Sequence, residues 1–171
     1  LALGIEAGNQ NVRLSIEKGR FKDVNIRSVV ELIKKYDIYI LGNYIVGFPE
    51  DNHESMNATL DLAIELNTEF ANFYPCQALP GSPLFTEAIK NGTNMQSYKY
   101  EEFAFLSYES KPLKTKYLSS AEVIAFRDHA WEKYHTNKNY LNLVEKKFGL
   151  ENRINVEEMA KIKLKRKLLE N

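Results

Sequence analysis

Apolar residues in the first 92 positions follow two periods, one typical of strands and one typical of helices. Apolar runs at 1–6, 38–46 and 70–74, the second rich in β-branched and aromatic residues, predict strands. The run at 38–46 alternates little, which favours a strand buried in a parallel sheet. Helical spacing predicts helices at 26–36 and 53–66, and cap and stop signals predict shorter ones at 11–17 and from Pro83 to Gly92.

Strands and helices therefore alternate three times along this segment. A helix that follows each strand returns the chain to the same end of the sheet, so the order predicts an α/β fold with a parallel sheet. Three strands do not close a barrel. We expect residues 1–92 to form half of a barrel or part of an open sheet.

The remaining residues, 93–171, predict a mostly helical extension. Aromatic residues between 98 and 108 fit a strand or an ordered loop. A capping box at 119–122 predicts the start of one helix, and a second is expected at 139–148. A last helix is expected to open at Asn155, and its basic end at 161–167 is interpreted as a solvated face.

Composition narrows the class of protein. The 23 basic and 23 acidic side chains cancel, which argues against a broad electrostatic nucleic-acid binder. No apolar run approaches the ~20 residues of a membrane span, and no signal-peptide pattern is present, so we expect a cytoplasmic protein. The single Cys76 excludes an internal disulfide and a self-contained zinc or iron–sulfur site. Because the chain begins with Leu1, we expect a segment of a longer polypeptide.

Polar or glycine-containing segments follow each predicted strand, where parallel α/β folds bind ligands. They are residues 6–10, residues 43 and 47–49, and residues 76, 77, 80 and 81. Loops of α/β proteins contain amides and glycines in any case. The pattern alone therefore leaves a ligand site and ordinary loop structure as equal alternatives.

Four stretches in order resemble the second half of a radical S-adenosylmethionine (radical SAM) core. They are GIEAGNQ at 4–10, IEKG at 16–19, YIVGFPE at 44–50 and LPGSPLF at 79–85. Ala7 stands where the family usually has Ser, and 50–52 departs from a common Gly-Glu-Thr. The resemblance implies a partial (β/α)6 TIM-type barrel whose last three strands lie in this chain.

The resemblance also implies cofactors and partners. The family holds a [4Fe–4S] cluster on a Cys-x3-Cys-x2-Cys loop, which this chain lacks, and Cys76 lies on the wrong strand. The cluster ligands, and the N-terminal half of the barrel, are therefore expected elsewhere in the same polypeptide. The implied reaction cleaves SAM to a 5′-deoxyadenosyl radical, with an electron donor such as flavodoxin or ferredoxin and an unidentified small-molecule substrate.

Individual site roles follow from the resemblance one position at a time. Glu6 resembles the residue that binds the SAM ribose, and Lys18 a cation near the SAM methionine or ribose. Asn43 resembles a polar residue that faces the cofactor. For Glu6 the alternative is a helix-capping carboxylate, and for Lys18 a solvated side chain.

The adenine of SAM is expected against residues 45–49, where Ile45 supplies apolar contact and Gly47 allows close approach. Gln77 is a weaker candidate for substrate or SAM contact. Ordinary strand-to-helix packing is the alternative for this stretch. No catalytic residue or metal ligand is predicted: the three His lack ligand spacing, and Cys76 fits a buried apolar position.

The second half resembles the tail of radical SAM proteins that carry an N-terminal cobalamin-binding domain. The matching stretches are LSSAE at 118–122, RDHAW at 127–131, YHTNKNY at 134–140 and LKRKLL at 164–169. This resemblance implies cobalamin as a cofactor bound outside the chain.

Two other functions stay open at this point. One is a non-catalytic α/β module that derives from a barrel and binds a partner. The other is an enzyme for a phosphate-containing substrate, against which no Gly-rich phosphate loop is present.

Overall fold

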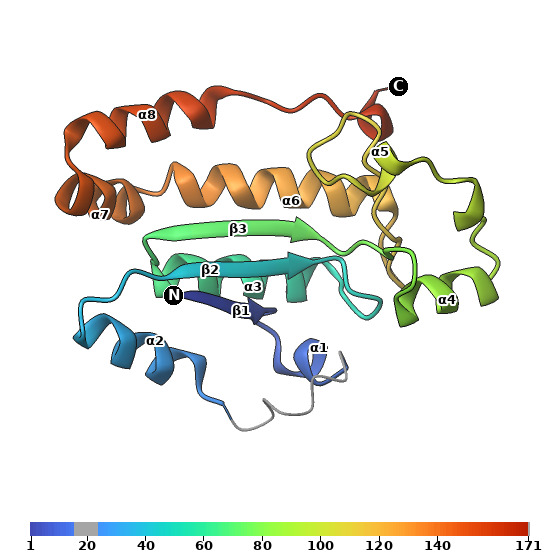
Figure 1. Cartoon of the computed structure of the whole chain (residues 1–171), viewed down its shortest axis with the longest axis horizontal. Helices are drawn as coiled ribbons and strands as arrows, with labels where there is room; N and C mark the ends of the chain where they lie inside the picture. Colours follow the sequence, from blue (N-terminus) through green and yellow to red (C-terminus); the bar gives the residue numbers. More distant parts are fainter. Residues whose placement is uncertain (16–23, 171) are drawn as a thin grey trace.

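The computed structural model describes residues 1–15 and 24–170, and strands alternate with helices over its first half (Figure 1). The strands are β1 (Ala2–Glu6), β2 (Leu41–Val46) and β3 (Phe70–Pro75). The helices are α1 (Gln10–Ser15), α2 (Ile26–Lys35), α3 (His53–Leu66), α4 (Pro83–Lys90), α5 (Tyr100–Phe103), α6 (Ser120–His135), α7 (Lys138–Phe148) and α8 (Leu150–Lys161), with 3-10 turns at Met95–Ser97 and Lys167–Leu169. The predicted order of the first half is confirmed.

Side-chain caps explain where several helices begin. Asn25 accepts from the backbone N–H of Ser28 at the start of α2, and Ser82 accepts from Phe85 N–H ahead of Pro83 in α4. Ser119 and Glu122 form the predicted capping box of α6. These local signals are readable in the sequence because the cap residue and its partner lie three positions apart.

The three strands form one parallel sheet in the order β1-β2-β3. The α/β prediction is therefore confirmed, whereas closure into a partial barrel stays a prediction. In the register, Gly4 pairs with Asn43, and Asn43 pairs with Asn72. Neighbouring side chains in such a row point to the same face of the sheet.

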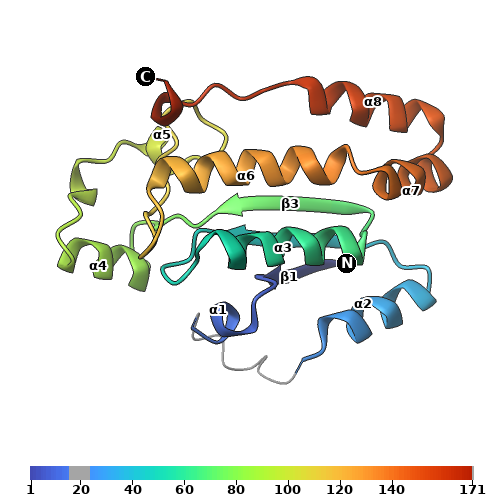
Figure 2. The same cartoon turned by 180° about the vertical axis from the view of Figure 1, so that it is seen from behind.

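One face of the sheet is buried under helices. Ile5, Tyr44 and Phe73 pack there with residues of α2, α3, α6 and α7. Figure 1 looks at the sheet with α3 behind it, and Figure 2 shows α3 in front, so α3 lies on one side only. The core contains residues from both sides of the expected boundary at residue 92.

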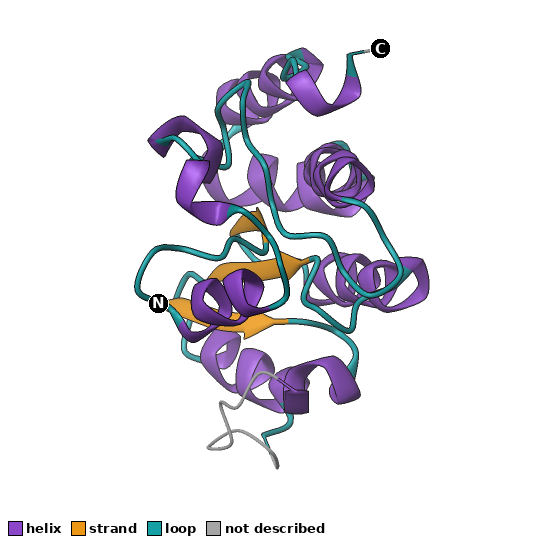
Figure 3. Ribbon diagram, turned by 90° about the vertical axis from the view of Figure 1, so that its right-hand side faces the viewer, coloured by secondary structure: helices purple, strands orange, loops and turns teal. Residues whose placement is uncertain are grey.

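The opposite face is only partly covered, and we call it the open face. Its residues are Gly4, Glu6, Asn43, Ile45, Asn72 and Tyr74, all half-buried or exposed. Figure 3 looks along the strands from their carboxyl ends and shows the helices packed around them. The two crossover helices α2 and α3 pack against the covered face. The polar residues of the sheet therefore lie on the open face.

Helix α6 closes the outer edge of β3. The Arg127 guanidinium donates from Nε to the carbonyl of Phe73 at 2.7 Å, and the Tyr134 hydroxyl donates to the carbonyl of Thr68 at 2.7 Å. The Tyr140 hydroxyl, from α7, reaches the carbonyl of Glu69 at 3.3 Å. These hydrogen bonds occupy backbone carbonyls at the edge of the sheet. Left unpaired, such carbonyls could accept hydrogen bonds from another strand. Within the described residues, no strand pairs with the outer edge of β1.

The aromatic stretch between 98 and 108 was predicted as a strand or an ordered loop, and the loop alternative holds, because residues 93–118 contain short helical turns and loops and, over this fully described stretch, no strand. Two other expectations for the second half need correction. The last helix begins at Leu150, because Gly149 at φ 91° separates α7 from α8, and it ends at Lys161. The lysines of the basic stretch 161–167 are exposed as expected, but most of the stretch lies beyond the end of α8 and Arg166 is buried. Arg166 is 2% exposed and bonds both carboxylate oxygens of Asp128 at 2.8 Å.

Within the described ranges, no helix combines the length and the hydrophobicity that crossing a bilayer requires.

Candidate functional site

Two amides on the open face are joined across β2 and β3. Asn72 donates from Nδ2 to Oδ1 of Asn43 at 3.1 Å, and Asn43 donates to the carbonyl of Leu3 at 3.4 Å. The half-buried Asn43 therefore has protein partners, as an amide in a strand requires. An amide offers two donor hydrogens and two acceptor lone pairs, so both residues keep capacity for a ligand.

Glu6 ends β1 in an unusual backbone conformation and lies over the same row. Its φ is 67°, and the pairing register shifts between Gly4 and Glu6. A Cβ atom at Gly4 would lie 2.8 Å from Glu6 Oε1, so the missing side chain makes room for the carboxylate. A left-handed non-glycine residue costs about 1–3 kcal/mol and tends to occur at functional sites.

The turn after β2 is built around a buried carboxylate. Asp51 accepts from the N–H groups of Gly47 and Phe48, both at 2.9 Å, and from the Ser55 hydroxyl at 2.5 Å. Burial raises the pKa of Asp51 above its ordinary 3.8, and these three hydrogen bonds oppose that rise. The turn is therefore held in one conformation before any ligand binds.

Gly47 has a packing role in this turn. Its φ is 85°, and a Cβ atom there would lie 2.3 Å from Cγ1 of Val123. The close approach that this glycine allows is therefore made by α6. Contact of Gly47 with a cofactor stays a prediction.

Ile45 joins a small apolar cluster at the carboxyl end of the sheet. It packs against Ala7, Val12, Phe48 and Cys76, which are all buried. Ala7 is 1% exposed, so the position where the resembled family has Ser is here part of an apolar contact. Burial raises the pKa of the Cys76 thiol to about 12, and the neighbouring carboxylates Asp51 and Glu6 add to the shift. Cys76 is therefore a buried small residue and no thiolate.

The other predicted site residues are placed less closely together. Gln77 donates from Nε2 to the Ser110 hydroxyl at 3.3 Å, which ties the end of β3 to the loop between α5 and α6. Lys18 lies outside the described residues. Glu6, Asn43 and Ile45 thus share the open face, while Gly47 lies in the turn after β2.

Metal binding finds no support in the described part of the chain. Within residues 1–15 and 24–170, no group of three or more His, Cys, Asp or Glu side chains could hold an ion. His53 lies 3.7 Å from Glu122 at the surface, and His135 is buried at the end of α6.

Sequence reasoning missed Gly4, Asn72 and Asp51 as parts of the site. Asn72 could have been found from the alternation of β3, since its register partner is Asn43. Gly4 belongs to the motif at 4–10, but its role is to leave room for the Glu6 carboxylate, and the position of that carboxylate is known only from the structure. Asp51 gave no signal of burial, because acidic residues in turns are usually exposed.

Comparison with known proteins relates the chain to methyl-transferring enzymes. It is 30% identical over 113 residues to bacteriochlorophyllide d C-12(1)-methyltransferase of Chlorobaculum tepidum. The aligned stretch covers 66% of this chain and 25% of that enzyme. It is 33% identical over 88 residues to an uncharacterized methyltransferase of Pyrococcus horikoshii, which covers 52% and 19%.

A third relative modifies tRNA. The chain is 34% identical over 85 residues to tRNA-2-methylthio-N(6)-dimethylallyladenosine synthase of a Ruegeria species, covering 48% of this chain and 19% of that enzyme. No family model matches the chain. The matches span a quarter or less of the length of each of these relatives.

Proposed function

We propose that this chain is the C-terminal part of a radical SAM enzyme and that its open face positions SAM. The observation that carries the proposal is the row formed by Glu6, Gly4, Asn43 and Asn72 on the open face of a parallel sheet. Such a row presents one carboxylate and two amides toward a common space. Nucleoside ligands need acceptors for ribose hydroxyls and mixed donors and acceptors for a base or an amino acid.

Each residue takes a role that its surroundings allow. Glu6 accepts hydrogen bonds from the ribose hydroxyls of SAM, and Asn43 faces the cofactor with its orientation fixed by Asn72. Ile45 contacts the adenine next to the turn that Asp51 holds. Gln77 and Lys18 are further contacts in this proposal. Holding several parts of SAM in fixed geometry is the contribution of this chain, because positioning lowers the entropic part of the barrier.

The described residues do not fit the iron–sulfur cluster of such an enzyme. Four-iron clusters need several thiolates, and this sequence has only Cys76, whose thiol is buried and protonated. The cluster is therefore proposed to be held outside this chain. When SAM is bound and reductively cleaved, it supplies methionine and a 5′-deoxyadenosyl radical.

Three features of the sheet support the partial barrel of this proposal. Both α2 and α3 contribute to the core on one face, as in a barrel with its helices outside, and α6 caps the carbonyls of the β3 edge. The edge of β1 pairs with no strand among the described residues. These features support a barrel that ends at β3 and continues from β1 into an N-terminal half.

The relatives support the same reaction class at a coarse level. Two of them are methyltransferases by name, and the third is a synthase of a methylthio-modified adenosine. A radical SAM-related function agrees with all three. Use of cobalamin, a cytoplasmic location and a small-molecule substrate belong to the proposal.

Calorimetric titration of the full-length protein with SAM tests this proposal. Glu6→Ala removes hydrogen bonds to a charged acceptor, which are worth about 1.5–3 kcal/mol, so SAM affinity should fall about 10- to 100-fold. Glu31→Ala, on the exposed side of α2, should leave it unchanged. Absence of SAM binding to the folded wild-type protein would instead support a non-catalytic module.

A further inference from the structure

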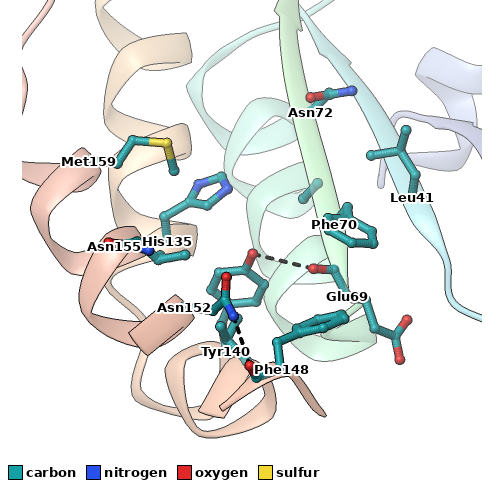
Figure 4. Close-up of a pocket in the computed structure, with 13 residues that line it drawn as sticks. Leu41, Glu69, Phe70, Asn72, His135, Tyr140, Phe148, Asn152, Asn155 and Met159 are labelled. Atoms are coloured by element: carbon teal, nitrogen blue, oxygen red, sulfur yellow. Dashed lines mark hydrogen bonds between the residues drawn. The ribbon is translucent and has the colours of Figure 1, made fainter. Parts of the chain in front are cut away.

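A pocket of about 680 Å³ lies far from the strand ends considered so far. It is lined by the first residues of β2 and β3 and by side chains of α7 and α8, with His135 at the end of α6 (Figure 4). Its volume falls within the range of small-molecule sites. The pocket meets the open face at Asn72, which lines both.

The walls of the pocket favour an apolar ring compound without charge. The lining includes Phe70, Tyr140, Phe148, Val156 and Met159, and none of the lining residues within the described ranges is Lys or Arg. The one lining carboxylate, Glu69, is 3% exposed. It accepts from the N–H of Ile40 at 2.9 Å and lies 3.9 Å from Lys147 Nζ. Its charge is thus already compensated and does not call for a cationic ligand.

His135 presents an unused acceptor to this space. The residue is 5% exposed, and its ring stacks on Trp131 with centroids 4.4 Å apart. Nδ1 lies 2.7 Å from the carbonyl of Trp131, which can only accept, so Nδ1 carries the hydrogen. Nε2 is then an acceptor, and it has no hydrogen-bond partner among the described residues. Burial lowers the pKa of His135, which keeps the neutral ring.

The edge of β3 adds polar backbone to the same pocket. Phe70 and Cys76 donate their N–H groups to the carbonyls of Ile40, just before β2, and of Val46, at its end. Alternate residues between Phe70 and Cys76 therefore face the outer edge. Ala71 is one of these and lines the pocket. The next edge-facing carbonyl, that of Phe73, already accepts from Arg127. An added peptide strand would therefore have few free backbone groups to pair with at this edge. A small molecule is the more suitable ligand for the pocket.

From these features we infer that the pocket binds an uncharged, flat heterocycle whose ring N–H donates to His135 Nε2. The ring packs against the aromatic side chains that line the pocket, and a carbonyl beside its N–H suits the outward-facing backbone of Ala71. The inference does not rest on the proposed function, since none of its contacts involves Glu6 or Gly47.

A matched pair of probes tests the site in the full-length protein. Quinolin-2-one carries the ring N–H beside a carbonyl, and 1-methylquinolin-2-one lacks the hydrogen. Wild-type protein should bind quinolin-2-one, measured by calorimetry, about tenfold more tightly than its methylated analogue, as one buried hydrogen bond implies. In H135F, which keeps a flat ring on Trp131, the two probes should bind equally.

A second variant locates the site independently of His135. Val156→Phe narrows the pocket from α8 and should weaken both probes at least about tenfold. Ile154→Phe places the same aromatic ring at an exposed position of α8 that does not line the pocket and should change neither affinity. Equal affinities of the two probes for wild-type protein would overturn the inference, as would no binding or no effect of V156F. Glu6→Ala should leave probe binding unchanged, which separates this result from any failure to bind SAM.

Discussion

The side chains of Asn43 and Asn72 are hydrogen-bonded to each other across neighbouring parallel strands, 3.1 Å from Nδ2 to Oδ1. The bond fixes which way the Asn43 amide points, because its oxygen accepts from Asn72 while its nitrogen donates to the Leu3 carbonyl. This ordered pair of amides on the partly covered face of the sheet supports the proposal that SAM binds there.

The first prediction concerns this amide pair. Asn72→Ala removes the bond that orients Asn43, so SAM affinity of the full-length protein should fall about 3- to 10-fold, the equivalent of one neutral hydrogen bond. Calorimetric titration measures the change. Asn57→Ala, at an exposed position of α3, is the control and should have no effect. A normal affinity for the Asn72 variant would show that the pair is only structural.

The second prediction concerns Gly47 and Val123. Gly47→Ala adds a Cβ atom where φ is 85° and where Val123 Cγ1 would lie 2.3 Å away, so it should lower the free energy of unfolding by about 2–4 kcal/mol. Val123→Ala on its own leaves a cavity. The double variant should be more stable than the sum of the two losses predicts, by about 0.5–3 kcal/mol. Urea denaturation measures all four proteins, and strict additivity would contradict the packing role.

The third prediction is a pH dependence. His135 has its pKa lowered from 6.5, mainly by burial and also by Arg127, against a raising effect of the Trp131 carbonyl. A depressed folded-state pKa means stability that is present above pH 6.5 and lost as pH falls through the lower folded value. Thermal unfolding between pH 7.5 and 5 should therefore show a loss of stability. In His135→Phe this loss should be smaller, and an identical pH profile in the two proteins would refute the assignment.

The fourth prediction separates the two kinds of cation in the C-terminal segment. Arg166 is buried, pairs with Asp128 and donates to the carbonyls of Phe105 and Ser107 at 2.9 and 2.8 Å. Arg166→Ala should lower the free energy of unfolding by about 2–4 kcal/mol, because it leaves these acceptors unpaired. Lys163→Ala removes only a surface ion pair with Glu132 and should cost less than about 1 kcal/mol. Equal effects in chemical denaturation would contradict this distinction.

Much of the first half was predictable because its signals are local. The bounds of α3 and the caps at Asn25, Ser82 and Ser119 depend on residues a few positions apart. The parallel direction of the strands follows from their alternation with helices. The last helix was misplaced because Glu157 and Glu158 look like a first turn, whereas Gly149 already starts a helix in which they lie near the end.

The rest of the site depends on contacts between distant residues. Nothing near Arg166 in the sequence indicates that Asp128 buries it, 38 positions away. Gly47 was expected to face a ligand, and only the placement of α6 shows that Val123 faces it. The pocket at His135 joins residues of β2, β3, α6, α7 and α8, so no stretch of sequence could reveal it.

Formation of 5′-deoxyadenosine by the full-length protein tests the central claim most directly. The protein, purified without oxygen, reduced and mixed with SAM, is predicted to release 5′-deoxyadenosine and methionine. Glu6→Ala at subsaturating SAM should lower the rate about 10-fold or more, and Glu31→Ala should not. Failure of the folded, cluster-containing protein to form 5′-deoxyadenosine, or an unchanged rate in Glu6→Ala, would contradict the account.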